Sequence, residues 1–370
     1  MTRARELAEL GAAYDSGALS NRNFITNGEM QCWQRATSAT AANNTYNTVD
    51  RFKAYNNIGA YTTERSTDNP NGSGYSLKCQ CTTANGSVAA SSYAFINHEI
   101  EGQNLQHLAY GTSNAKNVTL SFWVKSSKTG IYTVGVYKHA GGGSAYMYRK
   151  EYTISAANTW EKKTITISPT AGSTSFITAS AGAIQNNNSY GFGVSFNLSM
   201  GSNYQGANDT WENNAKYGTS NQVNWMDNTS NNFYITQIQM EVGESATPFE
   251  HRSYADELIK CQRYFCKIEN TTGSGQYFSM LQAYGNNVFG VLADYPVTMR
   301  TTPTAAQSGT FGVYLASSAN ASLSNTIGAL VPTSRSWTSQ GWGASSSLAA
   351  GDAAVTFWNN GAFLTADAEL

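Results

Sequence analysis

Pairs of titratable side chains are the first place to look for chemistry in this sequence. Glu99 follows His98, and Asp209 lies three positions before Glu212. Two carboxylates are enough to hydrolyse a glycosidic bond, one as the acid and the other as the base or nucleophile. However, no nucleophile elbow, phosphate-binding loop or dinucleotide fingerprint accompanies them, and carboxylates in such polar stretches are usually solvated loop charges. We therefore expect a protein without catalytic residues, not an enzyme.

The histidines and cysteines indicate neither a metal centre nor a redox pair. None of the four histidines has a second histidine at the i, i+4 helical spacing of a metal site. The five cysteines are odd in number and show no zinc or redox spacing. Cys79 and Cys81 lie two apart in a strand-like run, so their side chains share one face. We expect buried free thiols, no metal and no cofactor.

Two groups of aromatic residues in polar sequence are better candidates for recognition. The first lies in a long stretch without strand periodicity and comprises Tyr204, Trp211, Tyr217 and Trp225. The second comprises Trp337, Trp342 and Arg335. Flat rings with polar edges suit the faces of sugars, and long loops on a rigid scaffold often carry function. The alternative is that these rings fix their loops to a core or to another subunit.

Alternation of apolar and polar residues predicts the elements that position these groups. Phe192, Val194 and Phe196 alternate with small polar residues, as half-buried strands require, and Leu120 and Phe122 do the same. Many short strands with almost no helix between them are typical of an all-β sandwich. We predict a jelly-roll β-sandwich over residues 23–250.

A helix signal separates this region from a second one. Ser253 and Asp256 form a capping box, which marks a helix N-terminus. Apolar residues then recur at spacings of four, three and four, namely Tyr254, Leu258, Cys261 and Phe265. We predict a linking helix at 251–265, followed by a second, smaller β-sandwich-like domain at 266–370.

The N-terminal residues 1–22 are predicted to form an arm with a short helix. A helix this short is unstable alone and gains its stability from packing against something else. A docking role or a self-association role follows, and a frayed chain end is the alternative. The candidate attachment residues are Arg3, Arg5, Leu7 and Leu10.

Composition excludes some classes of partner. Charged residues make up 13% of the chain, where about 25% is usual, so Asn, Ser, Thr and Gly must supply most of the solubility. A net charge of -1 argues against a nucleic-acid partner, which needs a basic surface. No apolar run approaches the ~20 residues that span a bilayer, and the N-terminus lacks the apolar core of a signal peptide. We expect no membrane insertion and assembly in a cytoplasm.

Several segments together resemble tail-fibre or receptor-binding proteins of tailed bacteriophages. They are NRNFITNGEMQCWQRATS from Asn21, NTVDRFKAY from Asn47, EVGESATPFEHRSYADELIKCQRYF from Glu241, and the final TADAEL. The resemblance implies a structural protein of the virion tail, assembled in the bacterial host cytoplasm.

Other segments look like the jelly-roll sandwich of carbohydrate-binding modules. They are NFITNGEMQCW, VTLSFWVKSS, TWEKKTITI and FYITQIQMEVG. In that group an acidic residue shortly after the first Asn-Gly often helps to hold a structural calcium. Here the aligned residue is Gln31, with Glu29 nearby, and a neutral Gln is a poor substitute for a carboxylate around Ca²⁺. This departure puts a calcium site in doubt.

Together these features predict a short, homotrimeric tail fibre. Its N-terminal arm would attach to the phage tail or an adaptor protein, and its β domains would recognise a host surface glycan. The near absence of charge in residues 316–350 suits contact with other copies of the chain. A capsid or tail decoration protein that binds no receptor is the alternative. A glycan-degrading tailspike is a weaker one, because the chain lacks the regular repeat of a β-helix.

Overall fold

The chain folds into two compact units. The computed structural model describes residues 21–72, 74–141, 144–273, 275–284, 287–315, 329–343 and 350–370. The first unit extends to Glu257 and includes Leu370, and the second spans 258–369. The division falls inside helix α2 (Tyr254–Gln262), within the predicted linking segment. Nearly all of the predicted arm, with Arg3, Arg5, Leu7 and Leu10, lies outside the described residues.

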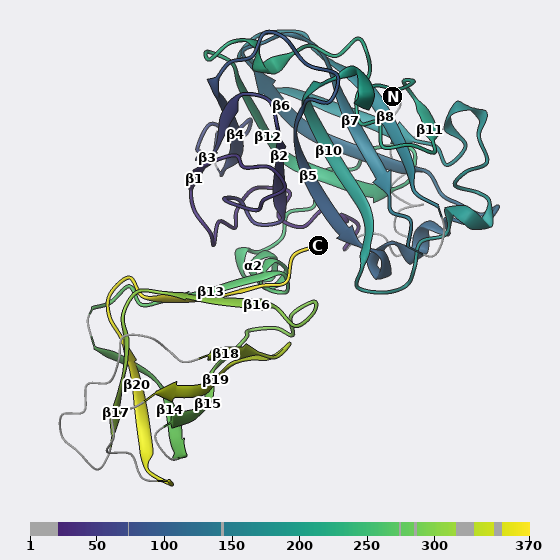
Figure 1. Ribbon diagram of the computed structural model, residues 1–370. Helices are drawn as coiled ribbons and strands as arrows, with labels where there is room; N and C mark the ends of the chain where they lie inside the picture. The colour runs from purple at the N-terminus through teal and green to yellow at the C-terminus, as the bar shows by residue number, and fades with distance from the viewer. Residues whose placement is uncertain are drawn as a thin grey trace. The chain divides into compact units, whose positions relative to one another are not determined.

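The first unit is a sandwich of two six-stranded antiparallel sheets (Figure 1). In sheet order, sheet I consists of β1 (Ser38–Thr40), β3 (Ala60–Ser66), β4 (Ser76–Thr83), β12 (Asn232–Val242), β6 (Val118–Ser126) and β9 (Glu161–Ile167). Sheet II consists of β11 (Thr210–Glu212), β8 (Tyr146–Ile154), β7 (Gly130–Lys138), β10 (Tyr190–Met200), β5 (Tyr93–Glu101) and β2 (Phe52–Asn56). Short 3-10 turns connect the strands, at η1 (Gly102–Leu108), η2 (Ala171–Ser173), η3 (Ser180–Gly182), η4 (Ser202–Tyr204) and η5 (Trp225–Asp227). The all-β sandwich predicted from the alternation is confirmed.

The core lies between the two sheets and follows the predicted period of two. Phe192, Val194 and Phe196 of β10 are fully buried, as are Leu120 and Phe122 of β6. Burial of each such side chain contributes roughly 1.5–3 kcal/mol relative to leaving it exposed. Alternate residues of the same strands therefore face away from the core, and on sheet II they form the outer face that concerns the site.

The segments from Asn21 and Asn47 contact each other and β12 through a polar network within the first unit. The Asn23 side chain accepts hydrogen bonds from the backbone of Ile25 and Met240 and donates one to the Ile238 carbonyl. The buried Asn27 amide similarly bonds Cys32 and the Asp50 carbonyl. Buried amides satisfied in this way fix chain paths, because a lost partner costs about 1–3 kcal/mol. These motifs therefore have a structural role.

Helix α2 begins at its predicted cap but is shorter than predicted. The Ser253 hydroxyl donates to Asp256 Oδ2 at 2.6 Å and accepts from the Asp256 backbone at 3.1 Å. Cys261 is buried, but Tyr254 is exposed, so the predicted apolar stripe is only partly covered. Phe265 belongs to a strand rather than to the helix, because the helix ends at Gln262.

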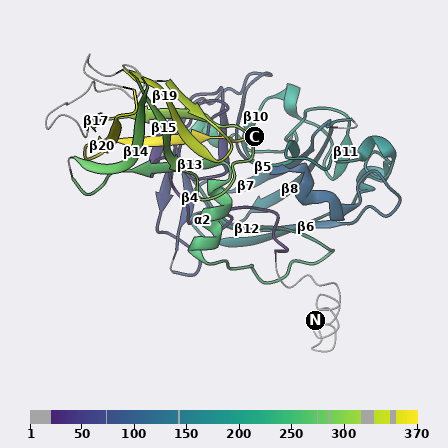
Figure 2. The same ribbon diagram turned by 90° about the horizontal axis from the view of Figure 1, so that it is seen from below.

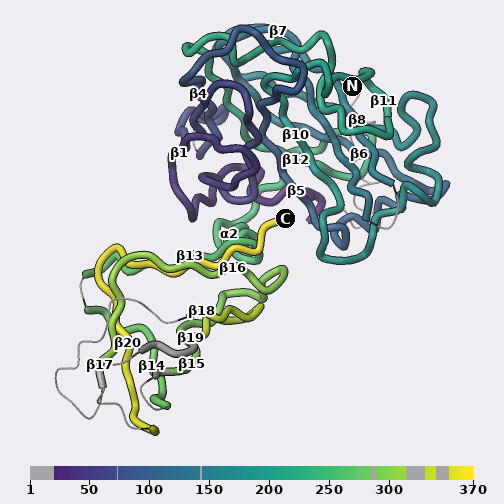
Figure 3. Tube along the Cα trace, in the orientation of Figure 1, coloured from purple at the N-terminus to yellow at the C-terminus, as the bar shows by residue number. Residues whose placement is uncertain are grey.

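The second unit contains two antiparallel sheets of its own. The smaller sheet consists of β13 (Phe265–Glu269), β21 (Phe363–Asp367) and β16 (Thr304–Ser308), and Figure 3 shows the yellow β21 between its neighbours. The larger sheet, sheet III, consists of β17 (Phe311–Leu315), β20 (Ala353–Trp358), β14 (Gln276–Tyr284), β15 (Asn287–Asp294), β19 (Ser336–Gly343) and β18 (Ala329–Pro332). A separate cluster of buried residues that includes Leu281, Phe311, Trp337 and Leu364 forms its core. The predicted second β domain is confirmed.

The cysteines agree with one further expectation. All five cysteines are buried thiols that form no disulfide, as predicted. Burial raises the pKa of the Cys79 and Cys81 thiols, so both stay protonated near neutral pH. No helix within the described ranges is both long enough and apolar enough to cross a membrane.

Candidate functional site

The outer face of sheet II carries a row of aromatic rings, which we call the aromatic row. It comprises Tyr46, Tyr55, Tyr93, Phe95, Tyr137, His139, Tyr190, Tyr204 and Tyr217. Tyr55 on β2 stacks on Phe95 on β5 with ring centroids 4.6 Å apart. Phe95 in turn stacks on Tyr217 at 5.0 Å. All of these rings except Phe95, which is buried, are half-buried, so most of the row keeps some contact with solvent.

The strand period explains why these rings share one face. In β5, Ala94 and Ile96 face the core, so Tyr93 and Phe95 must face outward. The same parity places Tyr55 of β2 outward, because Phe52 and Ala54 pack into the sandwich core. Pairing of β2 with β5, Tyr55 opposite Phe95, brings the rings together. The row is therefore a product of strand register rather than of loop sequence.

A buried carboxylate, Glu99 of β5, lies beside the row. The Tyr46 hydroxyl donates to Glu99 Oε2 at 3.2 Å, and the Tyr55 hydroxyl donates to Oε1 at 3.4 Å. Asn97 Nδ2 donates to Oε1 at 3.1 Å, and Lys53 Nζ lies 3.6 Å from the same oxygen. Glu99 thus collects one cation, one amide and two phenols, and it holds the two tyrosine rings in place.

The electrostatics keep the hydroxyls of the row neutral. Burial, with the nearby Glu99 charge, raises the pKa of Tyr46 and Tyr55 far above the ordinary tyrosine value. Burial also raises the pKa of Tyr217 to about 12 and that of Tyr137 by less. Burial lowers the pKa of His139, so its imidazole is neutral at pH 7. The row therefore offers apolar ring faces edged with uncharged donors and acceptors.

The part of the row at His139 and Tyr190 depends on a close contact within β10, between Gly193 and Tyr190. The His139 and Tyr190 rings stack at 4.9 Å, and Tyr190 contacts Tyr137 at 5.8 Å. A Cβ atom on Gly193 would overlap the Tyr190 hydroxyl and come within 3.2 Å of Asn97 Oδ1. Only glycine at this position lets the Tyr190 ring fold back over its own strand.

The predicted aromatic loop between residues 200 and 232 divides into two parts. Trp211 and Trp225 are fully buried in the sandwich core. The Trp211 indole donates to the Ser168 carbonyl at 2.9 Å, and Trp225 packs edge-on against Tyr61. Neither tryptophan presents a ring face to solvent, so the prediction that they bind a glycan is wrong. Their flat apolar rings fasten the loop to the core instead.

The two tyrosines of the loop do reach the aromatic row. Tyr217 stacks on Phe95, and Tyr204 contacts Tyr93 edge-on at 5.3 Å. The loop is folded on itself here, because the Gly218 backbone N–H donates to the Tyr204 carbonyl at 3.0 Å. Of the predicted loop residues, Tyr204 and Tyr217 therefore fit a recognition role by position.

Arg149 of β8 holds this loop against sheet II. Its guanidinium is completely buried and pairs with Glu212. It also donates to the Lys216 carbonyl at 2.7 Å and to the Ala207 carbonyl at 3.1 Å. One planar cation thus ties together three points of the loop, which is a geometry that suits arginine.

The C-terminal aromatic pair does not form a site among the described side chains. Trp337 is fully buried, donates to the Thr365 carbonyl at 3.1 Å and packs on Tyr295, so its predicted stacking on sugar is wrong. Arg335 is exposed in the turn before β19. The side chain of Trp342 lies outside the described residues.

The carboxylate pairs considered for catalysis are engaged in structure. Burial pushes the pKa of Asp209 and Glu212 upward, but hydrogen bonds from Lys150 and Arg149 respectively outweigh it, so both pKa values lie below the usual range. A glycosidase acid needs a raised pKa instead. His98, next to Glu99, is buried on the core side of β5 and bonds Thr26.

The position at which Gln31 put a calcium site in doubt holds a hydrogen-bonded pair. Gln31 Nε2 donates to Glu29 Oε2 at 2.6 Å, and His251 lies 3.0 Å from the other Glu29 oxygen. Across the ranges that the structure describes, no group of three or more His, Cys, Asp or Glu side chains is placed to hold a metal ion.

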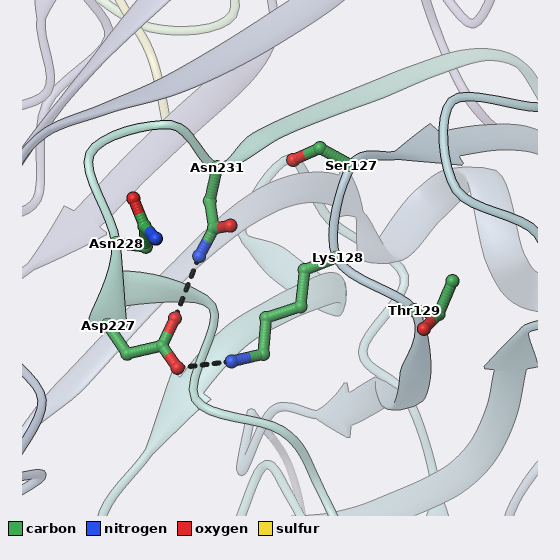
Figure 4. A pocket seen from close by; sticks show the side chains of 6 residues that line it. All are labelled: Ser127, Lys128, Thr129, Asp227, Asn228 and Asn231. Carbon is green, nitrogen blue, oxygen red and sulfur yellow. Dashed lines mark hydrogen bonds and ion pairs between the residues drawn. The ribbon is translucent and has the colours of Figure 1, made fainter.

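A polar hollow of about 470 Å³ lies at the end of sheet I (Figure 4). Within it, Lys128 forms an ion pair with Asp227, and Asn231 Nδ2 donates to Asp227 Oδ1 at 2.8 Å. The remaining lining residues are Ser127, Thr129 and Asn228. The hollow has no aromatic wall, and its charges already neutralise each other, so the aromatic row is the stronger candidate site.

No protein-family model and no curated protein matches this chain. Among solved structures, the chain is similar to the enzymatically active domain of tailspike protein 4 of bacteriophage CBA120, with 13% identity and a TM-score of 0.31. That match covers 60% of this chain but 22% of the tailspike chain.

The chain is also similar to β-sandwich domains that bind carbohydrate. One is the family 11 carbohydrate-binding module from Clostridium thermocellum in complex with a β-1,3-1,4-mixed-linked tetrasaccharide, with 12% identity, coverage of 57% and 98%, and a TM-score of 0.28. Another is a xylan-binding domain from Paenibacillus barcinonensis, with 9% identity, coverage of 59% and 99%, and a TM-score of 0.28. TM-scores at this level assign no function to this chain. A functional argument must therefore rest on its side chains.

Proposed function

We propose that the first unit binds a neutral glycan on the aromatic row of sheet II. The observation that carries this proposal is the stack of Tyr55, Phe95 and Tyr217, edged by hydroxyls that stay protonated. The C–H face of a sugar packs on flat rings, and its hydroxyls need both donors and acceptors. The phenol hydroxyls at the edges of the half-buried rings can act as both donors and acceptors.

Binding rather than hydrolysis fits the charges around the row. A glycosidase needs two carboxylates on opposite sides of the scissile bond, one of them with a raised pKa. Glu99 is engaged by Lys53 and Asn97, and the carboxylates of Asp209 and Glu212 are bound by Lys150 and Arg149. The protein that we propose is therefore a glycan-binding protein and not an enzyme.

The setting that we propose is the tail of a bacteriophage particle. The support is the sequence resemblance of four segments to tail-fibre proteins, together with the polar, weakly charged composition. In this proposal the chain is a homotrimeric short tail fibre, its residues 1–22 attach to the tail or an adaptor, and its sandwich meets a host surface glycan. Immunogold labelling of intact particles tests the location. Labelling of the capsid alone would favour the decoration-protein alternative.

The binding test compares half-buried tyrosines on the two faces of the sandwich. Tyr55→Ala and Tyr217→Ala should each weaken binding to a printed array of neutral and acidic oligosaccharides by about tenfold or more, which corresponds to ~1.4 kcal/mol. Tyr234→Ala is the matched control, because Tyr234 is a half-buried tyrosine of sheet I. Equal loss in all three variants, or binding to acidic glycans alone, would contradict the proposal.

A further inference from the structure

The outer face of sheet III in the second unit exposes a group of apolar side chains, with the polar Gln282 among them. Tyr277, Met280 and Tyr284 of β14 are 65%, 75% and 77% exposed. Phe289 and Val291 of the neighbouring β15 are also exposed. Figure 2 shows β14 and β15 side by side with β19. These five residues form what we call the apolar face.

Strand parity separates this face from the core of the unit. Leu281 and Ala283 of β14 and Leu292 of β15 are buried in that core, so the exposed residues between them point the other way. Met280 lies opposite Val355 of the adjacent β20, which is half-buried and extends the same face. The apolar face thus spans at least three neighbouring strands.

Sheet III is almost free of formal charge. Its six strands contain no Lys, Arg or Glu, and the single Asp is Asp294, the last residue of β15. An acidic or basic partner would therefore find no complementary charge. A second identical face, by contrast, would meet it without electrostatic repulsion.

The exposed area is large enough for a protein contact. With ~150–250 Å² for a fully exposed aromatic side chain, the five residues expose on the order of 600 Å². A monomer rarely leaves more than roughly 300–600 Å² of contiguous apolar surface uncovered. A stable interface takes about 800 Å² from each partner, of which the five residues supply most.

We propose that the apolar face binds another copy of this chain. Interface cores are rich in Met, Tyr and Phe and poor in charge, which is the composition of this face. Met280 and Val291 have no hydrogen-bonding groups for a saccharide, whereas such side chains suit the apolar core of a protein contact. This proposal is independent of glycan binding and locates self-association on sheet III.

The test is the mass of the full-length chain in solution at micromolar concentration, by sedimentation. Met280→Lys and Val291→Lys should weaken self-association by about tenfold or more, because each would bury an unpaired charge at the contact. Ile259→Lys is the matched control, since Ile259 of α2 and Val291 are both 48% exposed but only Val291 lies on the apolar face. Circular dichroism melting confirms that each variant is folded.

Each outcome decides the proposal. A dimer or trimer that dissociates in Met280→Lys and Val291→Lys, and persists in Ile259→Lys, supports it. A wild-type chain that is monomeric overturns it and shows that the face is covered in another way or binds a different partner. An oligomer that all three variants retain also overturns it. Because glycan binding is measured separately, a monomer that still binds the array leaves the proposed function of the first unit intact.

Discussion

Tyr217 stacks on Phe95 with ring centroids 5.0 Å apart and 23° between the ring planes, although one residue belongs to a long loop and the other to a central strand. The Asn197 side chain holds this arrangement, because its Nδ2 donates to the Tyr217 carbonyl at 2.8 Å. The loop is thereby part of the outer face of sheet II. Its tyrosines are positioned by the sheet and its tryptophans by the core.

Trp211 should contribute to stability and not directly to binding. Trp211→Ala removes a fully buried indole and the hydrogen bond to Ser168, and we expect a loss of roughly 3–5 kcal/mol in the free energy of unfolding. Chemical denaturation measures it. Trp160→Ala, at a half-buried indole, should cost clearly less. Equal stability of the Trp211 variant and the wild type would contradict its place in the core.

Arg149 should be required for the loop rather than for the sandwich as a whole. Arg149→Met removes the cation that joins Glu212, Lys216 and Ala207, so the loop loses its attachment to β8. Breaking such a buried pair costs about 3–5 kcal/mol. Limited proteolysis should cut the variant within residues 203–222 before the sandwich unfolds. Cleavage elsewhere first would show that Arg149 does not hold the loop.

Gly193 should be needed for the geometry of Tyr190. Gly193→Ala places a methyl group where the Tyr190 hydroxyl lies, and we expect weaker glycan binding with a stability loss of ~1–3 kcal/mol from overpacking. Gly86→Ala is the control, because its Cβ would contact nothing within 4 Å. Calorimetric binding and melting of both variants provide the comparison. Unchanged binding by Gly193→Ala would remove Tyr190 from the site.

Acid should destabilise the first unit partly through His98. Burial, with the nearby Arg51 charge, holds the pKa of His98 well below its ordinary value. Below about pH 6.5 the unfolded chain binds a proton that the folded chain does not, so stability falls by up to ~1.4 kcal/mol per pH unit until the folded pKa is reached. Urea denaturation at pH 7.5 and 5.0 measures this loss. His98→Asn should show a smaller loss than the wild type, and an equal or larger one would contradict the assignment.

The strands were predictable because their alternation is local. Phe192 and Val194 alternate with small polar residues in the sequence, and burial of one face is what that pattern requires. The same alternation contained the signal for the site, since Tyr93 and Phe95 occupy the outward positions of β5. That signal was missed because only aromatic residues in polar sequence without a strand period were selected as candidates.

The assignment of roles within the loop was not predictable in the same way. Trp211 and Tyr217 both occur in polar sequence without a strand period, yet Trp211 is buried and Tyr217 is half-buried on the outer face. The difference arises from the path of the loop across β8, which Arg149 fixes through contacts far apart in the sequence. Such long-range contacts leave no periodic pattern. The predicted helix extended to Phe265, beyond the true end at Gln262, for a related reason. Phe265 pairs with Asp367 in a sheet, and these two residues lie far apart in the sequence.

The two tryptophans and Arg149 maintain the fold of the loop, whereas its tyrosines lie where they can determine binding specificity. The anchors Trp211 and Trp225 are fully buried, whereas Tyr204 and Tyr217 lie outside the core. Substitutions at the tyrosines therefore leave the sandwich interior unchanged. A lineage under pressure to recognise a new surface can alter these positions while the fold persists. The tyrosine positions of the loop can therefore drift at little cost in stability, whereas its buried anchors cannot.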